Sequence, residues 1–169
     1  DLPNVKPPQM EAEAGPEQIP EGFNYYAGGH VHKHYKIPFK NGLLVYSGCT
    51  ETVSYEDAKV EKGFYHVEVN EKGVPKLNLT KLETPRHFII IKHDYTGSTP
   101  KKITEMAVKS VKEADEPGAV IVPVLQGMLP SEAKRGEIDL SQIRSSAQKA
   151  LHVHPILQLR ETEVSEEVI

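Results

Sequence analysis

The chain contains the stretch FNYYAGGHVH at residues 23–32, which is its most informative segment. The aromatic and apolar start of the stretch is typical of a short β-strand, and the glycines that follow are typical of a loop. His30 and His32 therefore stand one residue apart in a glycine-flanked loop at the end of a strand. Two neutral imidazoles in such a loop can direct nitrogen ligands at one metal centre. The sequence thus predicts a chemical site here, or half of one.

The composition is that of a globular protein, with 38% hydrophobic and 26% charged residues among 169. This is enough for one domain or for two small ones. No apolar run approaches the roughly 18 residues that cross a bilayer, and no signal segment opens the chain. The single cysteine, Cys49, cannot form an internal disulfide and is expected to be structural. We therefore expect an intracellular protein of the cytoplasm or nucleoid, with no membrane contact.

The charge is unevenly distributed along the chain. The net charge of -4 argues against a protein that coats nucleic acid with its whole surface. Basic residues nevertheless outnumber acidic ones between Arg86 and Arg160, whereas acidic residues dominate before and after this range. Such an imbalance permits a local surface that faces phosphates, although an ordinary solvated helix face also carries mixed charges.

The first part of the chain is expected to be rich in β-structure. A proline-rich lead-in at 1–21 interrupts any long regular element. Hairpin turns are predicted at Asn41-Gly42 and Lys72-Gly73. Short strand-like runs that turns separate are predicted at 23–27, 43–46, 63–69 and 75–82.

The second part has the pattern β-α-β-α-β. The strands are predicted at 86–95, 119–125 and 152–159. Thr99 and the proline after it are typical of a helix start, and this helix is expected to end before Pro117-Gly118. A second amphipathic helix, capped by Asp139 or Ser141, is expected to carry Ile143, Ala147, Ala150 and Leu151.

Three ordered motifs resemble one protein family. The segment IPEGFNYYAGGHVHK at 19–33 is similar to the pattern L-P-x-G-F-x-Y-Y-A-x-G-H-x-H-K/R. VYSGCTE at 45–51 is similar to V-Y-P-G-S-x-E, and EKGFYHVE at 61–68 to K-G-F-x-x-V-E. Together they resemble the double-strand-break repair nucleases of the meiotic-recombination-eleven and SbcD type, which are calcineurin-like metallophosphoesterases.

The resemblance implies an α/β (α+β) fold in two domains. Residues 1–84 would be the C-terminal part of a metallophosphoesterase β-sandwich, and 85–160 a small capping domain that guides DNA. Residues 161–169 are expected to be a tail or a cut linker. The family's Asp-x-His, Gly-Asp and Asn-His motifs do not precede residue 19. We therefore expect a C-terminal fragment that is inactive alone and contains no catalytic residue of its own.

The resemblance also assigns the metal ligands. It implies that His30 supports one manganese ion and His32 the other, in a two-metal hydrolysis of phosphodiester bonds. An isolated H-x-H pair most often binds no metal, but the surrounding motif favours the metal site. His34 stands where the family usually has a basic residue and is expected outside the site. His152 and His154 form a second H-x-H, which is expected to be a polar strand face.

The resemblance further implies DNA ends and an ATPase subunit of the structural-maintenance-of-chromosomes type as partners, and a homodimer of the intact protein. Phosphate contacts give affinity without sequence choice. The competing interpretation of each lysine or arginine is a solubilising surface residue. The candidate DNA-binding residues are Lys33, Lys101, Lys102, Lys134 and Arg135.

The sequence is compatible with more than one function. The main hypothesis is a fragment of a manganese-dependent DNA exonuclease or endonuclease. The alternatives are a non-catalytic module that binds DNA or a partner, with His30 and His32 structural, and another metallophosphoesterase. A cupin-like metal oxygenase also uses H-x-H, but the chain lacks the downstream Glu and distant His of that pattern.

Overall fold

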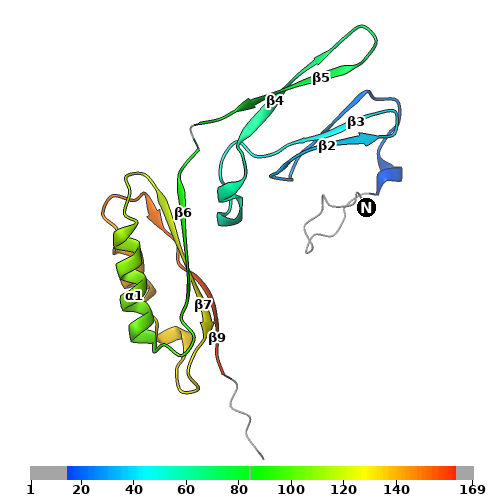
Figure 1. Ribbon diagram of the computed structural model, residues 1–169. Helices are drawn as coiled ribbons and strands as arrows, with labels where there is room; N and C mark the ends of the chain where they lie inside the picture. Colours follow the sequence, from blue (N-terminus) through cyan, green and yellow to red (C-terminus); the bar gives the residue numbers. More distant parts are fainter. Residues whose placement is uncertain (1–14, 84, 163–169) are drawn as a thin grey trace, which may run out of the picture. The chain divides into compact units, whose positions relative to one another are not determined.

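The computed structural model describes residues 15–83 and 85–162 and divides the chain into two units, Asp1–Pro85 and Arg86–Ile169 (Figure 1). Sheets dominate the described residues, with two α-helices and three short 3-10 helices beside them, so the predicted α+β class is confirmed. Among these residues no helix is both long and apolar enough to cross a membrane. The predictions for 1–14 and 163–169 lie outside the described residues.

Three strands form the first sheet of the Asp1–Pro85 unit. They are β1 (Tyr25–Gly28), β2 (His34–Phe39) and β3 (Gly42–Ser47), in the order β1-β3-β2. The central strand β3 pairs in parallel with β1 and antiparallel with β2. Strand β2 was not predicted; it contains Pro38, which lacks an N–H group and is tolerated because β2 lies at the edge of the sheet.

The turn between β2 and β3 lies one residue earlier than predicted. Phe39 pairs with Gly42, so Lys40 and Asn41 form the two-residue loop, and Lys40 has a positive φ of 51°. Gly42 is needed for another reason. A Cβ atom there would lie 2.2 Å from the carbonyl oxygen of Phe23, so only glycine lets the segment before β1 approach β3.

The second sheet of this unit is a hairpin of β4 (Gly63–Val69) and β5 (Pro75–Lys81). The predicted turn is confirmed, since Gly73 has φ 76° and its N–H donates to the carbonyl of Asn70. The Asn70 side chain also accepts hydrogen bonds from two backbone N–H groups of the turn. Two 3-10 helices, η1 (Pro16–Gln18) and η2 (Tyr55–Lys59), complete the described part of the unit.

The Arg86–Ile169 unit is built on an all-parallel sheet. Strand β7 (Val120–Met128) pairs with β6 (Phe88–Asp94) at one edge and with β8 (His152–Val153) and β9 (Ile156–Arg160) at the other. Helix α1 (Pro100–Glu113) lies along one face of this sheet (Figure 1). Its buried Ile103, Ala107 and Val111 join Ile121 and Leu125 of β7 in the core. Burial along most of β7 is typical of a central parallel strand.

The second predicted helix is much shorter than expected. Helix α2 spans only Leu140–Arg144, after the 3-10 helix η3 (Arg135–Glu137), and Asp139 caps it by accepting from the N–H of Gln142. Residues 148–150 instead donate their backbone N–H groups to the carboxylate of Asp115. Because this distant carboxylate accepts their hydrogen bonds, the backbone N–H groups of this segment need no helical partners. The predicted strand at 152–159 is also split, with His154 and Pro155 between β8 and β9.

Candidate metal centre

Residues 29–33 form an arch over the end of the central strand β3. Strand β1 lies on one side of β3 and β2 on the other, so the five-residue connection must cross the C-terminal end of β3. The chain leaves β3 beneath this arch, where the N–H of Cys49 donates to the carbonyl of His32 at 3.1 Å. The arch carries both His30 and His32, so the strand pairing fixes where the H-x-H motif stands.

His30 occupies a strained backbone conformation. Its φ is 69°, in the left-handed region. The two residues that flank His30 are hydrogen-bonded to each other, since the N–H of Val31 donates to the carbonyl of Gly29 at 2.8 Å. A hydrogen bond across a single residue of positive φ defines a tight γ-type turn, which is rare and costs free energy in a residue with a side chain. His30 is an exposed residue. Strain of this kind is typical of functional sites.

His32 is held by a carboxylate. Its Nδ1 lies 2.7 Å from Oδ2 of Asp57 in η2, 25 residues away in the sequence. The His32 side chain keeps 37% of its surface exposed, whereas the Asp57 side chain keeps 11%. Burial raises the pKa of the Asp57 carboxyl, but hydrogen bonds from His32 and Ser54 outweigh burial and hold the pKa below its ordinary value. The carboxylate is therefore ionised and accepts hydrogen bonds.

Two further residues fix Asp57 in place. Ser54 donates to Oδ2 of Asp57 through its backbone N–H and through its hydroxyl, both at 3.1 Å. Lys62 is buried and donates from Nζ to the carbonyl oxygens of Asp57 at 2.6 Å and Val60 at 2.7 Å. The buried lysine thus stabilises the backbone of the 3-10 turn, and the carboxylate of Asp57 is held against His32.

His34 lies beside the arch at the start of β2. Both of its ring nitrogens are buried and have no hydrogen-bond partner among the described residues. The ring packs edge-on against Tyr65, with 5.8 Å between ring centres. A Cβ atom on Gly48 would lie 2.9 Å from Nδ1 of His34 and from the carbonyl oxygen of His32. Glycine is therefore required where the chain passes under the arch.

The donor set fits part of a metal centre. His32 has the carboxylate–histidine arrangement that metal-ligating histidines usually show, and His30 stands on the same arch. Within residues 15–83 and 85–162, no group of three or more His, Cys, Asp and Glu side chains converges on a common point. His152 and His154 belong to the other unit and lie with 6.1 Å between ring centres. Among the described residues, neither ring is hydrogen-bonded to a carboxylate.

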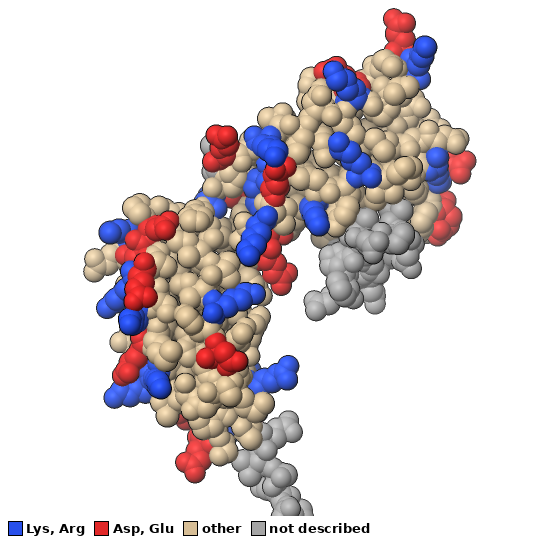
Figure 2. Space-filling view, viewed as in Figure 1, with Lys and Arg blue, Asp and Glu red and all other residues tan. Residues whose placement is uncertain are grey.

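The candidate DNA-binding residues lie in different surroundings. Lys33 is exposed on the arch, with Nζ 5.8 Å from the centre of the Tyr35 ring. Lys101 and Lys102 are exposed in the first turn of α1, where the helix dipole favours anions. On the face seen in Figure 2, basic and acidic side chains are interspersed within each unit.

Lys134 and Arg135 share one acidic partner. The carboxylate of Glu161 lies 3.9 Å from Nζ of Lys134 and 3.5 Å from Nε of Arg135. Glu161 also accepts from the backbone N–H of Arg135 at 2.9 Å, and this hydrogen bond is the leading cause of its lowered pKa. This carboxylate compensates part of the positive charge of Lys134 and Arg135, which were expected to bind DNA.

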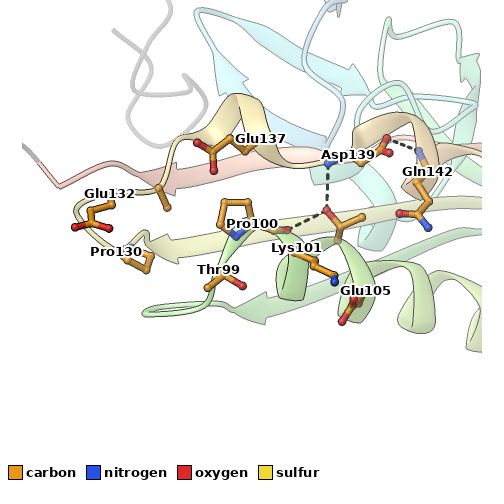
Figure 3. A pocket seen from close by; sticks show the side chains of 11 residues that line it. Thr99, Pro100, Lys101, Glu105, Pro130, Glu132, Glu137, Asp139 and Gln142 are labelled. Atoms are coloured by element: carbon orange, nitrogen blue, oxygen red, sulfur yellow. Dashed lines mark hydrogen bonds between the residues drawn. The ribbon is translucent and has the colours of Figure 1, made fainter.

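A cavity of about 710 Å³ opens at the start of α1 (Figure 3). Lys101 lines it, but so do four acidic residues: Glu105, Glu132, Glu137 and Asp139. Asp139 is engaged, since its backbone N–H donates to the hydroxyl of Thr104 and its carboxylate caps α2. The acidic lining opposes a phosphate inside this cavity.

The sequence reasoning missed Asp57, Ser54 and Lys62. A local signal did exist, because Ser54 and Asp57 have the S-x-x-D spacing of a helix start, and the two form a reciprocal capping box. Nothing in that spacing indicates that the same carboxylate reaches His32. That contact depends on how η2 packs against the arch, which only the tertiary structure shows.

Comparison with known proteins finds local similarity to a DNA repair protein. No family model matches the chain. The chain is similar to the DNA double-strand break repair protein Mre11 of Methanocaldococcus jannaschii, with 42% identity over 72 residues. The match covers 40% of this chain and 20% of the relative, so the similarity spans about a fifth of that protein's length.

Proposed function

We propose that this chain carries one part of the metal centre of a DNA nuclease that acts in double-strand-break repair. The observation that carries the proposal is the arch with His30 and His32, in which a buried carboxylate holds the second imidazole. The 42% identity to an Mre11 repair protein supports the same class of function. The proposal extends to hydrolysis of phosphodiester bonds by exonuclease or endonuclease action.

His30 and His32 are the residues that would hold manganese. Manganese accepts imidazole, carboxylate and water ligands, so two imidazoles suit it as part of a mixed ligand set. When bound, a pair of such cations activates water and stabilises the charge on the phosphate. Two imidazoles do not complete a two-metal centre. We propose that the remaining ligands come from outside the described residues.

The residues of the chain itself have separate tasks in this proposal. The strained turn fixes the backbone at His30, which is an exposed residue of the arch, and Asp57 orients the ring of His32. Lys33 stands next to the histidines and would hold a DNA phosphate beside them. Lys101 and Lys102, in the Arg86–Ile169 unit, are proposed as further residues that bind DNA. DNA ends, an ATPase subunit of the structural-maintenance-of-chromosomes type and a second copy of the protein are the proposed partners.

A cleavage assay tests the proposal in the complete protein that contains this sequence. We expect the variant His30→Ala/His32→Ala to lose manganese-dependent DNA cleavage by at least about a hundredfold. Replacing even an outer-shell partner of a metal ligand typically lowers metal affinity or activity about 10–100-fold. The matched control is His152→Ala/His154→Ala, which changes an H-x-H pair of the same spacing and should keep the activity.

The outcomes separate the alternatives. Equal cleavage by both variants, with unchanged melting temperatures, would remove the nuclease proposal. DNA binding without metal and without cleavage, unaffected by the change at His30 and His32, would instead favour a non-catalytic binding module.

A further inference from the structure

We propose that Asp57 is a positioning residue of the candidate metal centre: it holds His32 in the tautomer with hydrogen on Nδ1, so that Nε2 is the nitrogen offered to the metal. The inference rests on the proposed function, because it names the ligating atom of that site. It adds a residue to which the H-x-H motif itself does not point.

The direction of the hydrogen bond follows from the other contacts of Asp57. Its Oδ2 already accepts from the backbone N–H and the hydroxyl of Ser54, and a carboxylate at neutral pH has no hydrogen to donate. The 2.7 Å contact to His32 therefore requires the hydrogen on Nδ1 of the ring. In the neutral imidazole this leaves the lone pair on Nε2.

The carboxylate is itself well fixed. The backbone N–H of Ser54 and the buried Nζ of Lys62 hold η2 from its two ends, the latter through the carbonyl oxygens of Asp57 and Val60. Because these contacts fix Asp57, its carboxylate does not move with the ring of His32. The contact therefore sets the orientation of the His32 ring. A metal-ligating histidine usually donates its other N–H to such a partner, which fixes both the tautomer and the ring orientation.

The solvent exposure of the pair agrees with this division of tasks. The Asp57 side chain is nearly covered, whereas more than a third of the His32 side chain stays open. A carboxylate that served as a metal ligand would need an open approach. Asp57 therefore acts through His32, and it is a positioning residue rather than a ligand.

The tautomer can be read directly by long-range ¹H–¹⁵N NMR correlation on the metal-free chain at about pH 8.5, above the ordinary histidine pKa of about 6.5. We expect a protonated Nδ1 and an unprotonated Nε2 in His32. Asp57→Ala should shift His32 to exchange between both tautomers. Ser54→Ala is the matched control, because it removes one donor to the same oxygen and should leave the tautomer unchanged.

A second measurement is the affinity for manganese, followed by titration of the complete protein. We expect Asp57→Ala to weaken it about 10–100-fold, as the loss of an outer-shell partner does elsewhere, and Ser54→Ala to weaken it much less. Hydrogen on Nε2 of His32 in the unchanged chain would overturn the inference, even if the Asp57 variant failed to fold.

The inference and the proposed function can fail separately. Unchanged manganese affinity in Asp57→Ala would overturn the inference while the nuclease proposal stands. An Nδ1–H tautomer that depends on Asp57, in a protein that binds no manganese at His32, would instead leave Asp57 as a structural partner. That result would overturn both the ligating role of Nε2 and the metal site.

Discussion

Gly48 lies directly beneath His32: a Cβ atom at residue 48 would stand 2.9 Å from the carbonyl oxygen of His32. The same residue has φ 77°, so glycine is required both by the backbone conformation and by the space. The arch that carries the two histidines is thus supported by the chain segment that leaves β3.

Gly48→Ala should destabilise the Asp1–Pro85 unit. The positive φ costs about 1–2 kcal/mol in a residue with a side chain, and the overlap with the arch adds about 1–3 kcal/mol. The free energy of unfolding in urea measures the sum. Gly22→Ala is the control, because Gly22 has φ 90° but no atom within 4 Å of its added Cβ. Equal losses in the two variants would show that the arch does not rest on Gly48.

His30→Gly should stabilise the same unit. Glycine relieves the left-handed strain of about 1–2 kcal/mol, whereas the greater flexibility of glycine in the unfolded chain costs about 0.5–1 kcal/mol. The net gain in the free energy of unfolding is therefore up to about 1.5 kcal/mol. The matched variant His66→Gly, at an exposed strand position with ordinary φ, should lose stability instead. Thermal unfolding of both variants checks the signs. A loss in His30→Gly as large as that in His66→Gly would contradict the strained turn.

Asp115→Asn should flatten the acid dependence of stability in the Arg86–Ile169 unit. The backbone hydrogen bond from Gln148, with those from Ala150 and Lys149, holds the pKa of the Asp115 carboxyl below its ordinary value despite some burial. A lowered folded-state pKa gives stability that is present above the unfolded value of about 3.9 and lost as the pH falls through the folded value.

Urea unfolding between about pH 2 and pH 7 measures this effect, since the window must span the ordinary carboxyl pKa of about 3.9. The wild-type chain should lose stability in the acid part more steeply than Asp115→Asn. Glu116→Gln, a change at the exposed neighbour, serves as the control. Parallel pH profiles for wild type and Asp115→Asn would disprove the role of this carboxylate.

The basic residues of the second unit should contribute unequally to DNA binding. Lys101→Ala/Lys102→Ala should reduce the slope of log affinity against log salt by about 0.9 for each lost phosphate contact. Lys134→Ala/Arg135→Ala should reduce it less, because Glu161 already compensates these charges. Glu161→Gln should raise the affinity at low salt. Duplex binding over a salt series tests all three, and a larger effect of Lys134 and Arg135 would contradict this ranking.

The local sequence predicted most of the strands because their signals are local. Strand β4 is confirmed at its predicted bounds, and the capped start of α1 at Thr99 follows from the residues around it. Helix α2 was predicted too long because Ala147 and Ala150 have helical spacing. The carboxylate of Asp115, more than 30 residues away, takes the backbone N–H groups of that segment, and no local pattern reveals such a partner.

The same limit applies to the site. The H-x-H motif and its glycines could be recognised in the sequence, and the structure places both histidines on one arch. The strain at His30 depends on the order of the strands in the sheet. The contact of His32 with Asp57 and the ion pair of Arg135 with Glu161 each join segments that are distant in the sequence. Sequence patterns report spacing along the chain, whereas these features depend on packing.

The most direct test of the central claim locates manganese on the chain itself. Substoichiometric Mn²⁺ is paramagnetic and broadens the NMR signals of the groups nearest to it, so even weak binding is mapped. We expect the ring signals of His30 and His32 to broaden first, and His30→Ala/His32→Ala to abolish this. Broadening confined to His152 and His154 or to the acidic cavity at α1, with the arch unaffected, would contradict the assignment of a metal centre to the arch.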